Sequence, residues 1–213
     1  MRITDDKTLE IVEMVLCGGI NKEIASKINN CGCKAIGLSG KDASMIIAKK
    51  HNGKIKDESN IEKIIDLGFV GIPEKVNTEV IEVLITNDFI PVIAPLGIDD
   101  EGKTYNINAD TVAGVIAHSL NAKRLLVLTD VEGVKDKEDN IIEELTKEEA
   151  ETLIANKSIS GGMLPKVDTC IEAIENGVNA AVIVDGRVKH AVLLELFTEH
   201  GAGTLIRKNN VPK

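Results

Sequence analysis

A glycine pair followed by a lysine is the first segment of the chain that suggests chemistry. Ser160, Gly161 and Gly162 stand before an expected helix whose first turns contain Lys166. A cation at that place can neutralise negative charge on a phosphoryl group during its transfer, because that reaction is catalysed mainly by positioning and electrostatics. Since a single lysine on a helix is commonly just solvated, the segment indicates phosphate chemistry only together with other evidence.

A second candidate segment, LLVLTDVEGV at residues 125–134, reads as a buried strand that runs directly into a polar turn. Backbone N–H groups and Gly133 at such a turn can approach a nucleotide closely, while Asp130 can contact a sugar hydroxyl or a base edge. An ordinary turn after a strand, with Asp130 capping a local N–H group, fits the spacing equally well.

A third candidate segment, NINAD at residues 106–110, leads into a helical apolar pattern. Asn106 and Asn108 face the same side if the backbone is extended, and Asp110 stands at a helix start. These polar groups can surround a bound substrate, or Asn108 or Asp110 can serve as the N-cap of the helix. The pattern alone leaves both interpretations open.

The elements that would position these segments alternate between helices and strands. A helix is expected at residues 4–16, capped by Thr4 or Asp5 and ended by Gly18 and Gly19. Residues 52–77 are rich in turn signals and predict short strands or a hairpin. Further strands are expected at 34–39, 90–95, 124–129 and 180–184, and further helices at 21–29, 78–87, 110–120, 147–156, 163–176 and 190–198.

This alternation predicts an α/β fold, a three-layer αβα sandwich with a mainly parallel central sheet, in a single domain spanning 1–213. Ligands of open α/β sheets bind beyond the carboxyl ends of the strands. Three such ends carry polar or glycine-containing segments: SGKD, APLGIDDEG and TDVEGV. Their convergence predicts a binding site at that edge.

Charge and composition narrow the function classes. A net charge of -9 and a 2% aromatic content argue against nucleic-acid and membrane-surface partners. No long apolar run and no signal peptide are present, so we expect a cytoplasmic protein that acts on small molecules. Four cysteines are expected as reduced thiols, with Cys31 and Cys33 either idle or, as the less favoured alternative, a metal or redox pair.

Common nucleotide and metal signatures are missing from the sequence. It has no GxxxxGK[ST] loop, no GxGxxG segment and no HExxH cluster. A kinase built on this chain must therefore use another phosphate-binding architecture.

Six ordered segments together resemble the acetylglutamate kinases of the amino-acid kinase family. They are RITDDKTLEIVEMVL from Arg2, NKEIA from Asn21, GLSGKD from Gly37, NINAD, LTDVEGV and GGMLPKV, and they extend over almost the whole chain. The resemblance implies the αβα amino-acid kinase fold and transfer of the γ-phosphoryl group of ATP to the side-chain carboxylate of N-acetyl-L-glutamate, a step of arginine biosynthesis.

The resemblance also implies roles for individual residues. Arg2 would hold the substrate α-carboxylate, Asn106 would hydrogen-bond the bound acetylglutamate, Asp110 would organise catalytic lysines and Lys166 would stabilise the transferring phosphoryl group. The ATP site would be lined by Thr129, Asp130, Val131, Glu132, Gly133, Val134, Lys135, Ser158, Ile159 and Ser160, with Mg²⁺ bridging phosphate oxygens.

The sequence departs from the family pattern at its front. The family's first strand, with a second catalytic lysine in a K-x-G-G setting, and its GGG loop have no counterpart here, and Gly18-Gly19 follows the RITD segment instead of preceding it. We therefore expect this chain to lack part of the N-terminal region and to have weak or no activity by itself.

The C-terminal segment HAVLLELFTEHGAGTLI resembles the signature of arginine-inhibited members. In that comparison His190, Glu195, Gly201 and Gly203 frame a site for L-arginine as inhibitor, although a plain final helix and turn is the alternative. A homodimer is expected; the hexamer of arginine-inhibited members is in doubt, because it needs a helix that these residues do not include.

Two further function classes stay open at this point. One is another amino-acid kinase, such as glutamate 5-kinase, carbamate kinase or uridylate kinase, since segments like LTDVEGV are widely shared. The other is a non-catalytic arginine- or nucleotide-binding module.

Overall fold

A computed structural model describes residues 3–56, 62–198 and 201–208. The chain divides into two compact units, residues 1–112 and residues 113–213, and each is described by itself below. The expectation of a single domain therefore stays a prediction.

The first unit begins with a continuous helical stretch made of three pieces, α1 (Asp6–Glu13), the π-helix η1 (Met14–Ile20) and α2 (Asn21–Asn30). Asp5 caps its start as expected, because its Oδ1 accepts a hydrogen bond from the Thr8 backbone N–H at 2.8 Å. The prediction that Gly18 and Gly19 end the first helix was wrong: both lie inside η1, and the residues flanking η1 keep right-handed helical backbone angles.

Behind α2 lies a pair of parallel strands, β1 (Ala35–Ser39) and β4 (Ile90–Ala94), with α3 (Glu79–Thr86) preceding β4. The buried side chain of Asn21 joins helix and strands, because its Nδ2 donates to the carbonyl oxygens of Leu38 at 3.1 Å and Val92 at 2.8 Å. Both strands and the helix between them were predicted from their apolar patterns.

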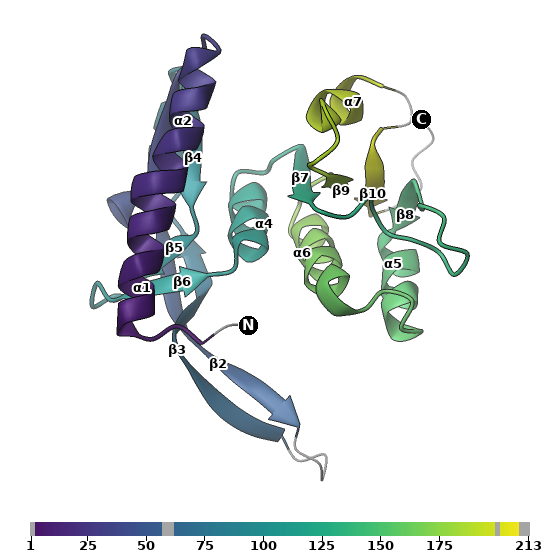
Figure 1. Ribbon diagram of the computed structural model, residues 1–213, viewed down its shortest axis with the longest axis horizontal. Helices are drawn as coiled ribbons and strands as arrows, with labels where there is room; N and C mark the ends of the chain where they lie inside the picture. Colours follow the sequence, from purple (N-terminus) through teal and green to yellow (C-terminus); the bar gives the residue numbers. More distant parts are fainter. Residues whose placement is uncertain (1–2, 57–61, 199–200, 209–213) are drawn as a thin grey trace. The chain divides into compact units, whose positions relative to one another are not determined.

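The rest of the first unit is a closed barrel of four strands. After the short helix η2 (Asp42–Ser44), β2 (Ile46–Lys56) and β3 (Glu62–Val76) form a long antiparallel hairpin (Figure 1), which confirms the hairpin expected between residues 52 and 77. β5 (Leu96–Ile98) and β6 (Thr104–Ile107) complete the barrel in the order β2-β3-β6-β5. These two short strands were not predicted.

The second unit contains a four-stranded sheet in the order β7-β9-β10-β8. β7 (Arg124–Thr129) is parallel to β9 (Ala180–Asp185), β10 (Gly203–Arg207) is antiparallel to β9, and β8 (Glu144–Thr146) is parallel to β10. The parallel β7 and β9 were expected, whereas β8 and β10 were not. The sheet is therefore mixed.

Helices cover both faces of this sheet (Figure 1). Ala181 and Ile183 of β9 face a core shared with α6 (Leu164–Glu175), α5 (Lys147–Ala155) and α4 (Ala109–Ser119). The alternate residues Val182 and Val184 face the opposite side, where Ala191 of α7 (Ala191–Phe197) packs against them. Within this unit the arrangement is helix, sheet and helix, as the sequence predicts.

Two further observations concern the described residues. No helix among them is long and apolar enough to span a bilayer. All four cysteines are free, with Cys170 buried and Cys31 and Cys33 exposed.

Candidate functional site

The carboxyl end of β7 opens onto a pocket of about 540 Å³ in the second unit. Its walls are the turn after β7, residues 158–160 before the short helix η3 (Gly161–Met163), the last residue of that helix and one residue that follows β9. The lining residues are Asp130, Val131, Glu132, Gly133, Val134, Lys135, Asp136, Asp139, Ser158, Ile159, Ser160, Met163 and Arg187. Pockets of this size accept ligands as large as a nucleotide.

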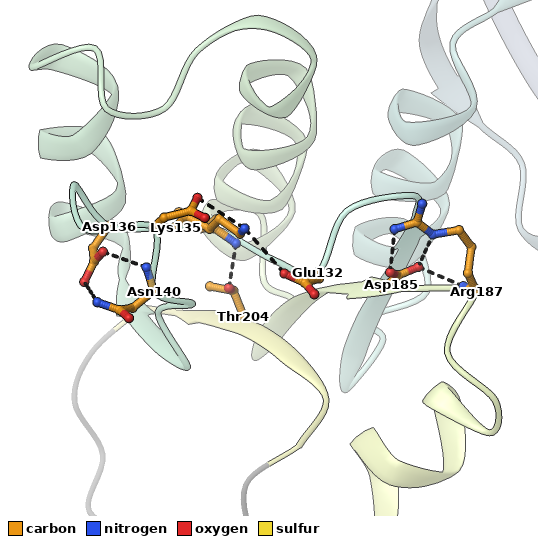
Figure 2. Close-up of polar contacts among 9 residues, drawn as sticks. Glu132, Lys135, Asp136, Asn140, Asp185, Arg187 and Thr204 are labelled. Carbon is orange, nitrogen blue, oxygen red and sulfur yellow. Dashed lines mark hydrogen bonds and ion pairs between the residues drawn. The ribbon is translucent and has the colours of Figure 1, made fainter.

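The turn after β7 is held against the sheet by one buried hydrogen bond. The Val134 N–H donates to the hydroxyl of Thr204 on β10 at 2.8 Å, and Thr204 is fully buried (Figure 2). Gly133 has a φ of 152°, and a Cβ at this residue would lie 2.6 Å from Thr204 Oγ1. Only glycine fits this backbone shape and this close approach.

The next residues close a tight turn on the carboxylate of Asp136. Its Oδ1 accepts hydrogen bonds from the N–H groups of Glu138 at 2.8 Å and Asn140 at 2.9 Å. Figure 2 shows the contacts between Asp136 and Asn140. These bonds, above all the one from the Asn140 N–H, lower the pKa of Asp136. Lys135 lies between the carboxylates of Glu132, at 3.4 Å, and Asp139, at 3.2 Å. Its charge is therefore largely neutralised by its neighbours.

Arg187 borders the pocket just beyond the end of β9. Its Nε and Nη2 donate to the two oxygens of the buried Asp185 at 2.9 and 2.8 Å, and its own backbone N–H adds a third bond at 2.9 Å. The guanidinium lowers the pKa of Asp185 to about 2. The neighbouring Gly186 N–H donates to the Thr129 carbonyl at 2.8 Å, which joins the ends of β7 and β9.

Another part of the pocket lining comes from the segment 158–163, through Ser158, Ile159, Ser160 and Met163. Ile159 is buried, and its N–H donates to the Leu153 carbonyl at 3.0 Å, which anchors the segment to α5. Ser160 is extended and Gly161 has a φ of 59°, so the chain turns sharply into η3 and α6. Lys166 is half-buried in the first turn of α6. A cation at that end of a helix is disfavoured by the helix dipole.

Of the substrate-binding and catalytic residues predicted in the first unit, those that the structure describes lie on β6 and at the start of α4. Asn106 lies on β6 and donates from Nδ2 to the hydroxyl of the buried Thr4 at 3.4 Å. Asn108 is the residue that caps α4, because its Oδ1 accepts from the Thr111 N–H at 3.1 Å. Asp110 is half-buried in the first turn of α4 and is not the cap. Arg2 lies outside the described residues.

Of the residues predicted to bind L-arginine, Gly201 lies against the buried carboxylate of Glu195. Oε2 of Glu195 accepts from the Ala202 N–H at 2.9 Å, and Oε1 lies 3.4 Å from Nη1 of Arg124. Gly201, with a φ of 66°, approaches so closely that a Cβ there would lie 2.6 Å from Glu195 Oε2. His190 precedes the same helix in an exposed, left-handed conformation. A glycine is needed at position 203 because a Cβ there would collide with the Ile183 carbonyl oxygen of the neighbouring strand β9.

Nine of the ten residues predicted for the ATP site thus line one pocket, while Thr129 stays outside the lining. The sequence reasoning missed Asp136, Asp139, Met163 and Arg187. Arg187 was in principle detectable, because the carboxyl ends of adjacent parallel strands lie side by side and it follows β9 by two residues.

Comparison with known proteins assigns the family. A model of the amino acid kinase family matches residues 1–185. The acetylglutamate kinase of Parvibaculum lavamentivorans is 60% identical over 98% of this chain and 69% of its own length. That of Bradyrhizobium diazoefficiens is 58% identical over 98% of this chain and 71% of its own length.

Solved structures agree on the fold. The N-acetylglutamate synthase of Neisseria gonorrhoeae, complexed with coenzyme A and N-acetyl-glutamate, aligns with a TM-score of 0.84 at 24% identity, over 99% of this chain and 46% of that one. A carbamate kinase from Giardia lamblia aligns with a TM-score of 0.60 at 16% identity, over 95% of this chain and 74% of that one. The chain therefore belongs to the amino acid kinase family and, within it, to the acetylglutamate kinases.

Proposed function

We propose that this chain serves the acetylglutamate kinase reaction, in which the γ-phosphoryl group of ATP passes to the side-chain carboxylate of N-acetyl-L-glutamate during arginine biosynthesis. The observation that carries the proposal is the pocket after β7, which gathers residues 130–135 and 158–160 around one space. The close relatives named acetylglutamate kinase supply the substrate.

In this proposal the pocket holds ATP. Backbone N–H groups of the turn after β7 and polar side chains such as Ser158 and Ser160 contact the nucleotide. Among the described residues, no group of three or more His, Cys, Asp or Glu side chains is arranged to hold a metal ion. Mg²⁺ would therefore come with ATP, held mainly by its phosphate oxygens, and would reduce the charge that the protein must stabilise.

Lys166 and Asp110 are the proposed catalytic residues. Lys166 would donate to the transferring phosphoryl group, where negative charge is concentrated in the transition state. The carboxylate of Asp110 would attract and orient the catalytic lysines. Asn106 would hydrogen-bond N-acetyl-L-glutamate, and Arg2 would bind its α-carboxylate with the fork of a guanidinium.

We also propose regulation by L-arginine at Glu195. The buried Glu195 carboxylate, with the backbone of Gly201 and Ala202 beside it, offers charge and hydrogen bonds to a guanidinium or an amino group. We further propose a cytoplasmic homodimer, in keeping with an enzyme of small-molecule metabolism.

The decisive experiment measures ADP release that depends on N-acetyl-L-glutamate. It compares the 213-residue chain with a version joined to the upstream segment of one of the relatives, each with and without L-arginine. Because residues 1–213 contain no K-x-G-G segment and no GGG loop, we expect little turnover from the chain and robust, arginine-inhibited turnover from the longer version. Lys166→Ala in the longer version should abolish it.

Failure of both versions to release ADP would contradict the proposed reaction. The second candidate, a nucleotide-binding module without phosphoryl transfer, is favoured because all described lining residues of the pocket lie within residues 113–213. Tight ATP binding by both versions with no turnover from either would support it.

A further inference from the structure

Arg187 is held in one orientation by the side chain behind it. The carboxylate of Asp185 is 5% exposed and accepts hydrogen bonds from Nε, Nη2 and the backbone N–H of Arg187. The third nitrogen of the guanidinium, Nη1, points away from this carboxylate (Figure 2). Since the fork is already fixed, little further entropy is lost when Nη1 binds a ligand.

The two cations of the pocket lining differ in their ion-pair partners. The lining contains four carboxylates, Asp130, Glu132, Asp136 and Asp139, and two cations, Lys135 and Arg187. Lys135 is shared by Glu132 and Asp139. The partner of Arg187, by contrast, is Asp185, which is not part of the lining. Among the described lining residues, Arg187 is thus the cation whose ion-pair partner lies outside the lining.

An anionic ligand needs such a charge in this pocket. Without Arg187, a phosphate would meet four carboxylates and one lysine that is already paired twice. The field of Asp130 and Glu132 also contributes to the raised pKa of Arg187, after the larger contribution of Asp185. Arg187 and these two carboxylates are all part of the pocket lining.

We propose that Arg187 binds an anionic phosphate oxygen of the nucleotide through Nη1 and that Asp185 is the residue that positions it. The inference rests on the proposed nucleotide site and adds a residue that the family resemblance did not indicate. The Gly186 N–H bond to the Thr129 carbonyl keeps Arg187 at a fixed distance from the turn after β7. The adenosine moiety is bound by other parts of the pocket.

The test is a comparison of ligands that differ in phosphate. Binding of ADP and of adenosine to the 213-residue chain is measured by calorimetry for the wild type, Arg187→Ala, Arg187→Lys and Asp185→Asn. Lys189→Ala is the matched control, because it removes the same charge from an exposed residue outside the pocket lining. Thermal melting of each variant reports on folding.

We expect Arg187→Ala to weaken ADP binding about tenfold, the size of one charge-assisted hydrogen bond, and to leave adenosine binding unchanged. Arg187→Lys should recover part of this loss, since it restores charge without the fork. Asp185→Asn should show a smaller loss, also confined to ADP, and Lys189→Ala should bind like the wild type.

Three outcomes would overturn the inference, and they are distinguishable. If the wild type binds neither ligand, the proposed nucleotide site is contradicted. If it binds both and Arg187→Ala binds ADP equally well, only the role of Arg187 fails. A loss of adenosine and ADP binding by the same factor, with a lowered melting temperature, would show that Arg187 supports the fold and not the phosphate.

Discussion

Each unit of the molecule has a buried polar side chain that joins segments far apart in the sequence, and the two contacts serve different ends. In the first unit, the amide of Asn21 reaches from α2 to carbonyl oxygens of both β1 and β4. In the second, the hydroxyl of Thr204 holds the Val134 N–H in the turn after β7. The first contact joins core elements, whereas the second shapes the pocket. Substitutions at the two should therefore separate stability from ligand binding.

Asn21→Ala should have the largest effect on stability. It leaves the half-buried carbonyl oxygens of Leu38 and Val92 without this donor, so we expect a loss of about 3 kcal/mol in the free energy of unfolding. The measurement is urea denaturation, with hydrogen exchange of β1 and β4 to localise the change. ADP affinity of the folded variant should stay the same; a matching loss of affinity would mean that the two contacts are not separable.

Gly133→Ala should damage the pocket directly. The new Cβ would meet Thr204 Oγ1 at 2.6 Å in a backbone conformation that side chains rarely adopt. We expect about 2 kcal/mol of destabilisation and a loss of ADP binding of at least about tenfold. Gly18→Ala is the control in the other unit, because a Cβ there meets nothing within 4 Å; it should be neutral or stabilising. Unchanged ADP binding by Gly133→Ala would contradict the described turn.

Thr204→Val tests the hydrogen bond without changing the size of the side chain. The buried Val134 N–H loses its acceptor, so we expect a cost of about 1–2 kcal/mol and ADP binding weakened several-fold. Calorimetric titration and thermal melting give the two values. If stability falls while ADP binding is kept, the turn holds its shape without this bond.

Acid should produce the smallest effect, through Asp185. Its folded pKa of about 2 lies below its ordinary value of 3.8, so the ionised pair with Arg187 stabilises the fold above about pH 4. That contribution is lost as the pH falls towards 2. The difference in urea midpoint between the wild type and Asp185→Asn should therefore shrink between pH 5 and pH 2. A constant difference over this range would rule out the ionised pair as its source.

Local sequence patterns were sufficient for much of the second unit. Residues 124–129 were predictable as a strand because they contain a short run of apolar residues, of which Leu125 and Val127 are buried. Residues 130–135 stay together in the pocket because they are consecutive. Strand β8 was missed since its three residues carry too little periodicity. Strand β10 (GTLIR) was missed because a glycine and an arginine leave only three central residues that favour a strand. Arg187 was missed because its place depends on β9 lying next to β7.

Long-range arrangements in the first unit were harder to predict. Asn106 meets Thr4 across 102 positions of sequence, and no local pattern encodes that contact. The continuity of the helical stretch through Gly18 and Gly19 was also missed, because glycines usually end helices. Here the helical stretch continues through the exposed pair, and its buried residues lie in the flanking helices, Leu9 in α1 and Asn21 and Ala25 in α2.

The π-helix η1 has a consequence for the winding of this helical stretch. Leu9 and Asn21 are both buried, yet twelve residues of regular α-helix would place them about 120° apart around the axis. A π-helix holds roughly 4.4 residues per turn, so the seven residues of η1 advance by only about 82° each and the total comes to roughly three whole turns. The wider winding therefore places Leu9 and Asn21 on the same side of the helical stretch. The length of the Gly18-Gly19 region thereby sets the direction in which Asn21 points, and loss of one residue from it would rotate the amide away from β1 and β4.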